Sequence, residues 1–115
     1  MEHETIITKA YDFLLYLIPQ LSKYPRNQKF ILADRIQILS MDILDSFLEA
    51  YYTSGPRKME ILVNTNVKLE KLRYLIRLSH DLQLINTHRY EVISSKINEI
   101  GKMLGGWRNS LGKRQ

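Results

Sequence analysis

The sequence predicts an all-α protein, an antiparallel four-helix bundle with up-down-up-down topology. Two observations carry this prediction: apolar residues recur at helical spacing in four successive segments, and three short breaks containing Pro25, Pro56 and Asn86 separate the segments. Four helices joined by short turns pack most simply when each runs antiparallel to the one before it. The 115 residues are enough for one such domain, which we expect over residues 1–107, followed by a basic, flexible tail over residues 108–115.

The first helix is expected over residues 5–22. Its apolar stripe consists of Ile7, Ala10, Tyr11, Leu14, Leu17, Ile18 and Leu21. Pro19 lies inside this helix, where it lacks a backbone donor and clashes with the preceding turn. We therefore expect either a kink near Leu15 or a helix that ends early.

The second helix is expected from Asn27 or Gln28 to Tyr52, because Gly55 and Pro56 stop it there. Its apolar stripe consists of Leu32, Ile36, Leu39, Ile43, Phe47 and Ala50. The opposite side carries an acidic row made of Asp42, Asp45 and Glu49. Such a row is either a solvated face or a surface that docks on the basic side of a partner, including the next subunit of an assembly.

The third helix is expected over residues 57–84 and carries more apolar residues than one buried face needs. A first set comprises Leu62, Leu69, Leu72, Ile76 and Leu82, and an adjacent second set comprises Ile61, Leu75, Leu78 and Ile85. A helix of a lone four-helix bundle buries one sector of limited width. The extra width predicts that neighbouring subunits cover part of this helix.

The fourth helix is expected from Thr87, which would be its N-cap, to Leu104. Its packing seam advances in steps of three and four through Tyr90, Ile93, Ile97, Ile100, Leu104 and Trp107. Gly101 lies inside this helix at a cost of roughly 1 kcal/mol relative to alanine. Either another backbone approaches closely at Gly101, or the helix simply tolerates the glycine.

Composition limits the location and the chemistry of the protein. The chain has no cysteine, which excludes disulfides and Cys-based metal sites and fits a reducing cytosol. The longest charge-free stretch, residues 13–22, is far shorter than the ~20 residues that span a bilayer. His3 and His88 have no helical metal-ligand spacing. We therefore expect a cytoplasmic protein with no membrane span, no metal and no cofactor.

The basic residues are concentrated in the second half of the chain. Residues 55–115 contain 12 Lys and Arg against 5 Asp and Glu, whereas residues 1–54 contain 5 against 7. Helices that are apolar on one side and basic on the other are typical of proteins that bind polyanions. The charge distribution therefore predicts a nucleic-acid-binding surface on the third and fourth helices.

Arg73 and Arg77 are the leading candidates for phosphate contacts. They lie one turn apart on one helix face, and guanidinium groups suit phosphate oxygens. Further side chains are expected to extend this surface toward nucleic acid or a protein partner: Lys68, Lys71, Arg89 and Lys102. The alternative is a salt-bridged surface in which Glu70 and Asp81 neutralise the two arginines.

Several segments together resemble a known family, the accessory variability proteins (Avd) of diversity-generating retroelements. They are residues 24–30 (YPRNQKF), Arg35-Ile36, residues 69–82 (LEKLRYLIRLSHDL) and residues 99–107 (EIGKMLGGW). The resemblance extends from the first helix to Trp107. The four-helix proteins encoded by intervening sequences of some large-subunit ribosomal RNA genes share the Pro-Arg and Arg-Ile features and are the alternative family.

The resemblance to Avd implies a homopentameric barrel of four-helix bundles. Its basic surface would bind structured template RNA and the reverse transcriptase of the element, and would support error-prone cDNA synthesis that miscopies adenines. Arg73 and Arg77 match the paired arginines of that family. The implied protein is an accessory factor and not an enzyme.

Two other classes of function have weaker support in the sequence. Arg73 and His80 lie at the outer limit of the Arg-x4-6-His spacing of helical HEPN ribonucleases, in which the histidine acts as acid or base. The residue after Arg73 is Tyr74, where such nucleases usually have a polar residue. Basic amphipathic helices also bind anionic membranes, but here each helix has three others on which to bury its apolar face.

Overall fold

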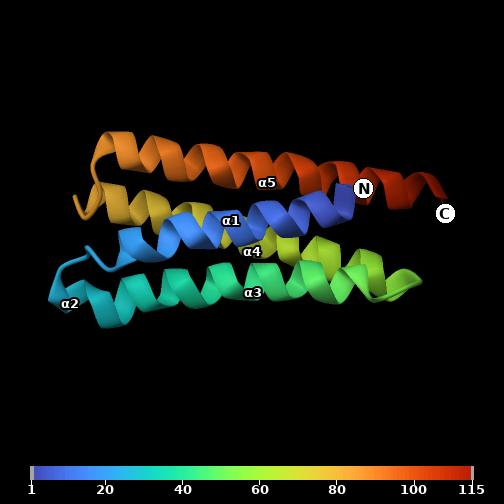
Figure 1. Cartoon of the computed structure of the whole chain (residues 1–115), viewed down its shortest axis with the longest axis horizontal. Coiled ribbons are helices and arrows are strands. Elements are labelled where there is room, and N and C mark those ends of the chain that lie inside the picture. Colours follow the sequence, from blue (N-terminus) through green and yellow to red (C-terminus); the bar gives the residue numbers. More distant parts are fainter. Residues whose placement is uncertain (1, 115) are drawn as a thin grey trace.

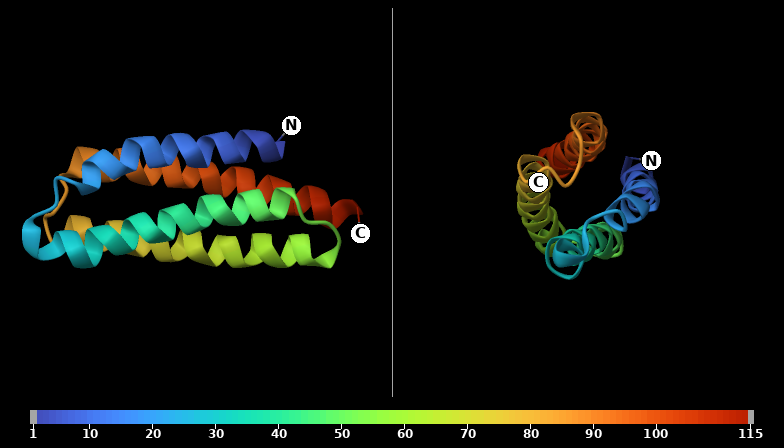
Figure 2. Two further views of the ribbon diagram at one scale, coloured as in Figure 1. Left: turned by 60° about the horizontal axis from the view of Figure 1, so that its bottom comes forward. Right: turned by 90° about the vertical axis from the view of Figure 1, so that its left-hand side faces the viewer.

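The computed structural model describes residues 2–114, with side chains from residue 5 to residue 113. Four long helices run alternately up and down the bundle: α1 (Glu2–Leu21), α3 (Asp34–Tyr51), α4 (Pro56–Asp81) and α5 (Thr87–Arg114) (Figure 1). Each packs on its neighbours in the order α1, α3, α4, α5, and α5 closes the bundle against α1. The bundle measures 47 × 23 × 20 Å, and its end view in Figure 2 shows the four helices around one axis. The predicted all-α four-helix architecture is confirmed.

The core is built from one apolar stripe of each helix. Every predicted stripe residue of the second helix is buried or packed against the core, and so is the complete seam of the fourth. On α1 the stripe is rotated, because Ile6 and Phe13 are buried while Tyr11 and Ile18 are exposed. On α4 the interior residues are Ile61, Leu62, Leu69, Leu72 and Ile76. Leu82, a member of the first predicted set, is exposed, and so is Leu78 of the second set, part of which was expected to be covered by neighbouring subunits.

Pro19 does not end α1 early, because the helix continues to Leu21. The proline lies on the exposed side of the helix, and so does Leu15, whose carbonyl loses its helical donor. Water can satisfy a carbonyl on this side, which explains why the helix tolerates the proline.

The segment before α3 has a geometry that the sequence pattern did not predict. A short helix, α2 (Arg26–Gln28), leads into a π-helical turn, η1 (Lys29–Ala33), and the chain then continues as α3. The wider turn changes the phase of the helix, so that Leu32 and Ala33 enter the core. Phe30 and Ile31 are left 71% and 70% exposed.

The turn between α4 and α5 is closed by two backbone hydrogen bonds around a left-handed residue. Gln83 has φ +63°, and its N–H donates to the carbonyl of His80 at 2.9 Å. The N–H of Leu84 donates to the carbonyl of Ser79 at 2.8 Å, which completes a Schellman motif. The N-cap of α5 is Asn86, whose Oδ1 accepts the N–H of Arg89 at 2.7 Å. The prediction of Thr87 as N-cap is therefore wrong.

The last helix is longer than predicted. α5 continues past Leu104 to Arg114, so no break in secondary structure separates residues 108–114 from the bundle. Trp107 is buried, the ammonium of Lys58 lies 5.6 Å from the centre of its ring, and Leu111 packs against the core. Within the described part of the chain, no helix combines the length and apolarity needed to cross a bilayer.

Candidate nucleic-acid interface

Arg73 links α4 to α5. Its Nε donates to Oδ1 of Asn98 at 3.3 Å, and its Nη1 forms an ion pair with Glu70 on its own helix. A Cβ added at Gly101 would lie 2.6 Å from Nη2 of Arg73. The glycine therefore makes room for an arginine side chain, which is neither the close backbone nor the simple tolerance that the sequence left open. Since only 31% of the Arg73 side chain is exposed, this residue holds two helices together.

Arg77 lies one turn further along α4 and is more accessible. Its side chain is 63% exposed, and its Nε lies 3.8 Å from Oδ2 of Asp81. An ion pair of this length on the surface stabilises the fold little and breaks readily. Arg77 therefore remains available to a phosphate, although both acidic neighbours foreseen for the two arginines do approach them.

His80 is not directed toward Arg73. Its ring stacks on Tyr90 at 4.5 Å between centroids, and its Nε2 lies 3.3 Å from Oγ1 of Thr87. The step of seven residues from Arg73 to His80 corresponds to about 10 Å along a helix. The two side chains contact different residues of α5, so this pair does not form an acid–base site within one chain.

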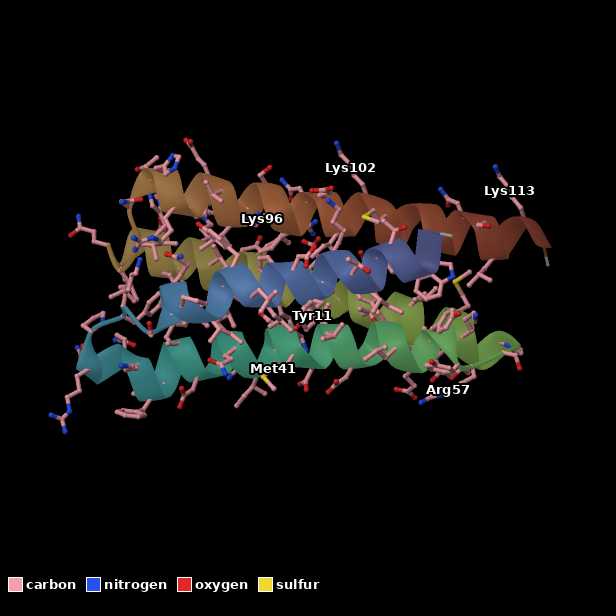
Figure 3. All side chains as sticks on the ribbon, viewed as in Figure 1. Tyr11, Met41, Arg57, Lys96, Lys102 and Lys113 are labelled. Carbon is pink, nitrogen blue, oxygen red and sulfur yellow. The ribbon has the colours of Figure 1, made fainter. Side chains whose placement is uncertain are left out.

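The other four predicted basic residues do not lie together. Lys68 donates to Oγ of Ser46 at 2.9 Å and so faces α3. Lys71 lines a groove between α3 and α4. Lys102 is exposed on α5 and points away from the bundle (Figure 3). Arg89 lies beside the buried Tyr24 at one end of the bundle. The structure therefore does not gather the predicted set on one face.

A wide groove with a volume of about 910 Å³ lies between η1, α3 and α4. Its apolar lining includes Phe30, Ile31, Ile38, Val67 and Tyr74. All five of these side chains are exposed. Contiguous exposed apolar areas of this kind are typical of surfaces that contact a partner.

Further apolar side chains are exposed on α1 and α3, and we refer to them as the α1–α3 apolar surface: Tyr11, Leu15, Ile18, Met41 and Leu48. Tyr11 and Met41 are labelled on neighbouring helices in Figure 3. None of these five side chains lines the groove, so one chain exposes apolar side chains in two separate sets.

These surfaces contain the residues that the sequence reasoning missed. Phe30 and Ile31 were not assigned to any face, and Ile38 was not part of the predicted stripe of its helix. The signal was present as a surplus of apolar residues around the second helix. It was obscured by the π-helical turn, which changes the phase at Lys29–Ala33.

The acidic row is divided between two roles. Glu49 forms an ion pair with Arg57 at 3.3 Å, which joins α3 to the start of α4. Asp42 lines the groove, and Asp45 is exposed. Among residues 5–113, no group of three His, Asp or Glu side chains is placed to hold a metal ion.

Comparison with known proteins shows the family and the fold of the chain. A crystal structure of a protein of unknown function, from the S23 ribosomal protein family of Bacteroides thetaiotaomicron, superposes with a TM-score of 0.86 at 19% identity. The match covers 95% of this chain and 99% of that one, and at this identity it shows the fold alone. No curated protein matches the chain. The model of the bAvd-like family matches residues 5–111, nearly the whole bundle. The chain belongs to the bAvd-like family.

Proposed function

We propose that this protein is the accessory factor of a diversity-generating retroelement, which binds the reverse transcriptase and the structured template RNA of the element. The observation that carries the proposal is the bAvd-like family match over residues 5–111. The surplus of five positive charges supports it, because sequence-independent RNA binding is dominated by contacts to phosphates. The protein acts in the cytoplasm by binding and not by catalysis.

The accessible basic side chains supply the RNA contacts in this proposal. Arg77 and Lys102 are exposed on α4 and α5, and Arg73 fixes the relative position of these two helices through Asn98. Lys71 adds charge on the groove side of α4. Contacts of this type bind phosphates with little base discrimination, so the template RNA is recognised by its shape.

Self-association is the second part of the proposal. The α3–α4 groove of one subunit packs on the α1–α3 apolar surface of the next, and because these two surfaces differ the contact is heterologous. A heterologous contact closes into a ring when its rotation permits, and the family resemblance suggests five subunits. Light scattering of the nuclease-treated protein tests this directly, with five 13.6 kDa chains expected and a monomer or dimer contradicting it.

The test of the function is co-purification of the tagged protein with a retroelement reverse transcriptase and its template RNA. We expect all three components in one complex with the wild-type chain. The double substitution R77A/K102A should reduce RNA retention at least about tenfold, because it removes two accessible phosphate contacts.

The double substitution K9A/R57A is the matched control, because it also removes two positive charges. Lys9 is paired with Glu99, and Arg57 is paired with Glu49 and Glu60 at the other end of α4. A wild-type protein that retains neither the polymerase nor the RNA would contradict the proposed function. Equal RNA retention by R77A/K102A and the control would contradict only the placement of the contacts.

The ribosomal intervening-sequence proteins remain the second candidate. The S23-family fold match supports this alternative at the level of architecture. Retention of ribosomal RNA, with no polymerase in the complex, would favour it.

A further inference from the structure

The two turns at one end of the bundle are unusually rich in positive charge. Residues 22–30 and 82–90 contain four cationic residues and no aspartate or glutamate. We refer to these four, Lys23, Arg26, Lys29 and Arg89, as the turn patch. Three of them come from the half of the chain that is acidic overall, so the net charge of that half conceals them.

Antiparallel topology brings both turns to the same end. The connection from α1 to α2 and the connection from α4 to α5 lie together in the end view of Figure 2. Tyr24 fixes this arrangement, because its side chain is only 4% exposed and packs into the core. The charge of Arg89 lies close enough to oppose the rise that burial causes in the pKa of Tyr24. Arg89, in the first turn of α5, therefore lies at the same end of the bundle as the connection from α1 to α2.

The cations of the first turn are free, in contrast to several arginines elsewhere. Lys23, Arg26 and Lys29 are exposed, and among the described residues no carboxylate forms an ion pair with them. Arg57, Arg73 and Arg77 each have an acidic partner. A ligand that binds these three cations does not first have to break an internal ion pair. The full positive charge of the three side chains is therefore available to the ligand.

We propose that the turn patch binds the phosphate backbone of RNA. The two residues between Arg26 and Lys29 are the amides Asn27 and Gln28, which can donate hydrogen bonds to phosphate or sugar oxygens. A membrane-binding surface would carry apolar side chains between its cations, whereas the exposed Phe30 and Ile31 follow Lys29 and line the α3–α4 groove. This proposal rests on the proposed RNA-binding function and assigns its phosphate contacts to a second place, the end of the bundle.

The test compares two triple variants that lose the same net charge. K23Q/R26Q/K29Q removes the exposed cations of the turn patch and leaves Arg89 beside Tyr24. K9Q/R57Q/K113Q removes three cations elsewhere, of which Arg57 and Lys113 lie toward the opposite end of the bundle (Figure 3). Circular dichroism establishes that both variants keep their helicity. Fluorescence anisotropy then measures their binding to a labelled oligouridylate over a series of salt concentrations.

The turn-patch variant should bind the oligouridylate at least about tenfold more weakly than the wild type at low salt. Loss of three single-strand phosphate contacts should also weaken the salt dependence, so that the negative slope of log affinity against log salt becomes less steep by about 2. The control variant should change the affinity by less than about threefold.

Equal effects of the two triple variants would overturn the turn patch while leaving the proposed function in place. A wild-type protein that binds no RNA would overturn both proposals. Phosphatidylserine vesicles are the competing probe: loss of vesicle binding in K23Q/R26Q/K29Q, with oligouridylate binding unchanged, would assign the patch to a membrane surface instead.

Discussion

At the scale of single residues, the structure separates side chains that hold the fold from those that remain available to a partner. Arg73 and Lys68 resemble surface cations in the sequence, yet each is engaged with a neighbouring helix, through Asn98 and Ser46 respectively. The role of Arg73 could not be predicted, because it depends on Asn98 and Gly101, which are distant in sequence. Local spacing reveals only its near neighbour Glu70.

Gly101 and Arg73 should show thermodynamic coupling. In the wild type, the substitution G101A gains roughly 1 kcal/mol of helix propensity. It also displaces the guanidinium from Asn98, and the net change in unfolding free energy should be below about 0.5 kcal/mol. In the R73A background nothing opposes the new methyl group, so G101A should stabilise by about 1 kcal/mol.

Urea denaturation of the four proteins in this cycle measures the coupling. Equal effects of G101A in both backgrounds would show that Arg73 does not depend on the glycine.

Tyr24 should make stability depend on pH under alkaline conditions. Its hydroxyl is buried and has no hydrogen-bond partner among the described residues. The hydroxyl of nearby Ser79 donates to the carbonyl of Leu75. Burial raises the pKa of Tyr24 above its ordinary value of 10.0, although Ser79 and Arg89 partly oppose the rise. The folded state therefore keeps this proton at a pH where the unfolded state releases it. The resulting stabilisation is present below about pH 10 and is lost as pH rises through the folded-state pKa.

The substitution Y24F checks this dependence. Near neutral pH the change in unfolding free energy should be less than about 1 kcal/mol, because no hydrogen bond is lost. Above pH 10 the wild type should lose stability relative to Y24F in urea denaturation. Parallel pH profiles of the two proteins would mean that the folded-state pKa is not raised.

At the scale of elements, predictions succeeded where one period held over a whole helix. The stripes of α3 and α5 follow uninterrupted steps of three and four, and these residues form the core. On α1, apolar residues occur on several sides, so the pattern did not determine which of them face inward, and Tyr11 and Ile18 were misplaced. The π-helical turn η1 has no recognisable sequence signature. A left-handed residue after a helix is usually a glycine, but here it is Gln83, so the sequence did not indicate this turn.

The start of α5 offers a test of an individual capping residue. Replacing Asn86 by alanine should lower the unfolding free energy by about 1 kcal/mol, because the N–H of Arg89 loses its acceptor. Replacing Thr87 by alanine should cost clearly less, since this side chain has only a 3.3 Å contact with His80. Thermal denaturation of both variants compares them. A larger loss for Thr87 would return the capping role to that residue.

At the scale of the whole molecule, the bundle has more apolar surface than a monomer needs. Of the second apolar set predicted for the third helix, Leu78 is exposed, whereas Leu75 is half-buried and Ile61 and Ile85 are buried. Val67 and Tyr74, which were not part of that set, add exposed apolar surface on α4. The structure adds a groove wall from η1 and α3 that the sequence did not indicate. Which surfaces meet in an assembly depends on tertiary arrangement, and periodicity within one helix could show only that some apolar residues remain outside the core.

The assembly proposal predicts that one charge in the groove will reduce the number of subunits. Ile38 is 60% exposed and lines the groove, so I38D should hardly affect the fold of a single chain but should prevent apolar contact with a neighbour. Light scattering should give a smaller mass than for the wild type. The matched control is L82D, at a similarly exposed leucine outside the groove lining, which should leave the mass unchanged. An unaltered mass for I38D would place the subunit contact elsewhere.

The position of the one tryptophan has a spectroscopic consequence. Trp107 is buried near the C-terminal end of α5, under the ammonium of Lys58, whereas the turn patch lies at the opposite end of the bundle. Its intrinsic fluorescence is therefore a local reporter for the far end of the molecule. Quenching that follows RNA addition would indicate either a second contact near Trp107 or a rearrangement transmitted along the helices. Unchanged emission would indicate that RNA binding does not alter the surroundings of Trp107.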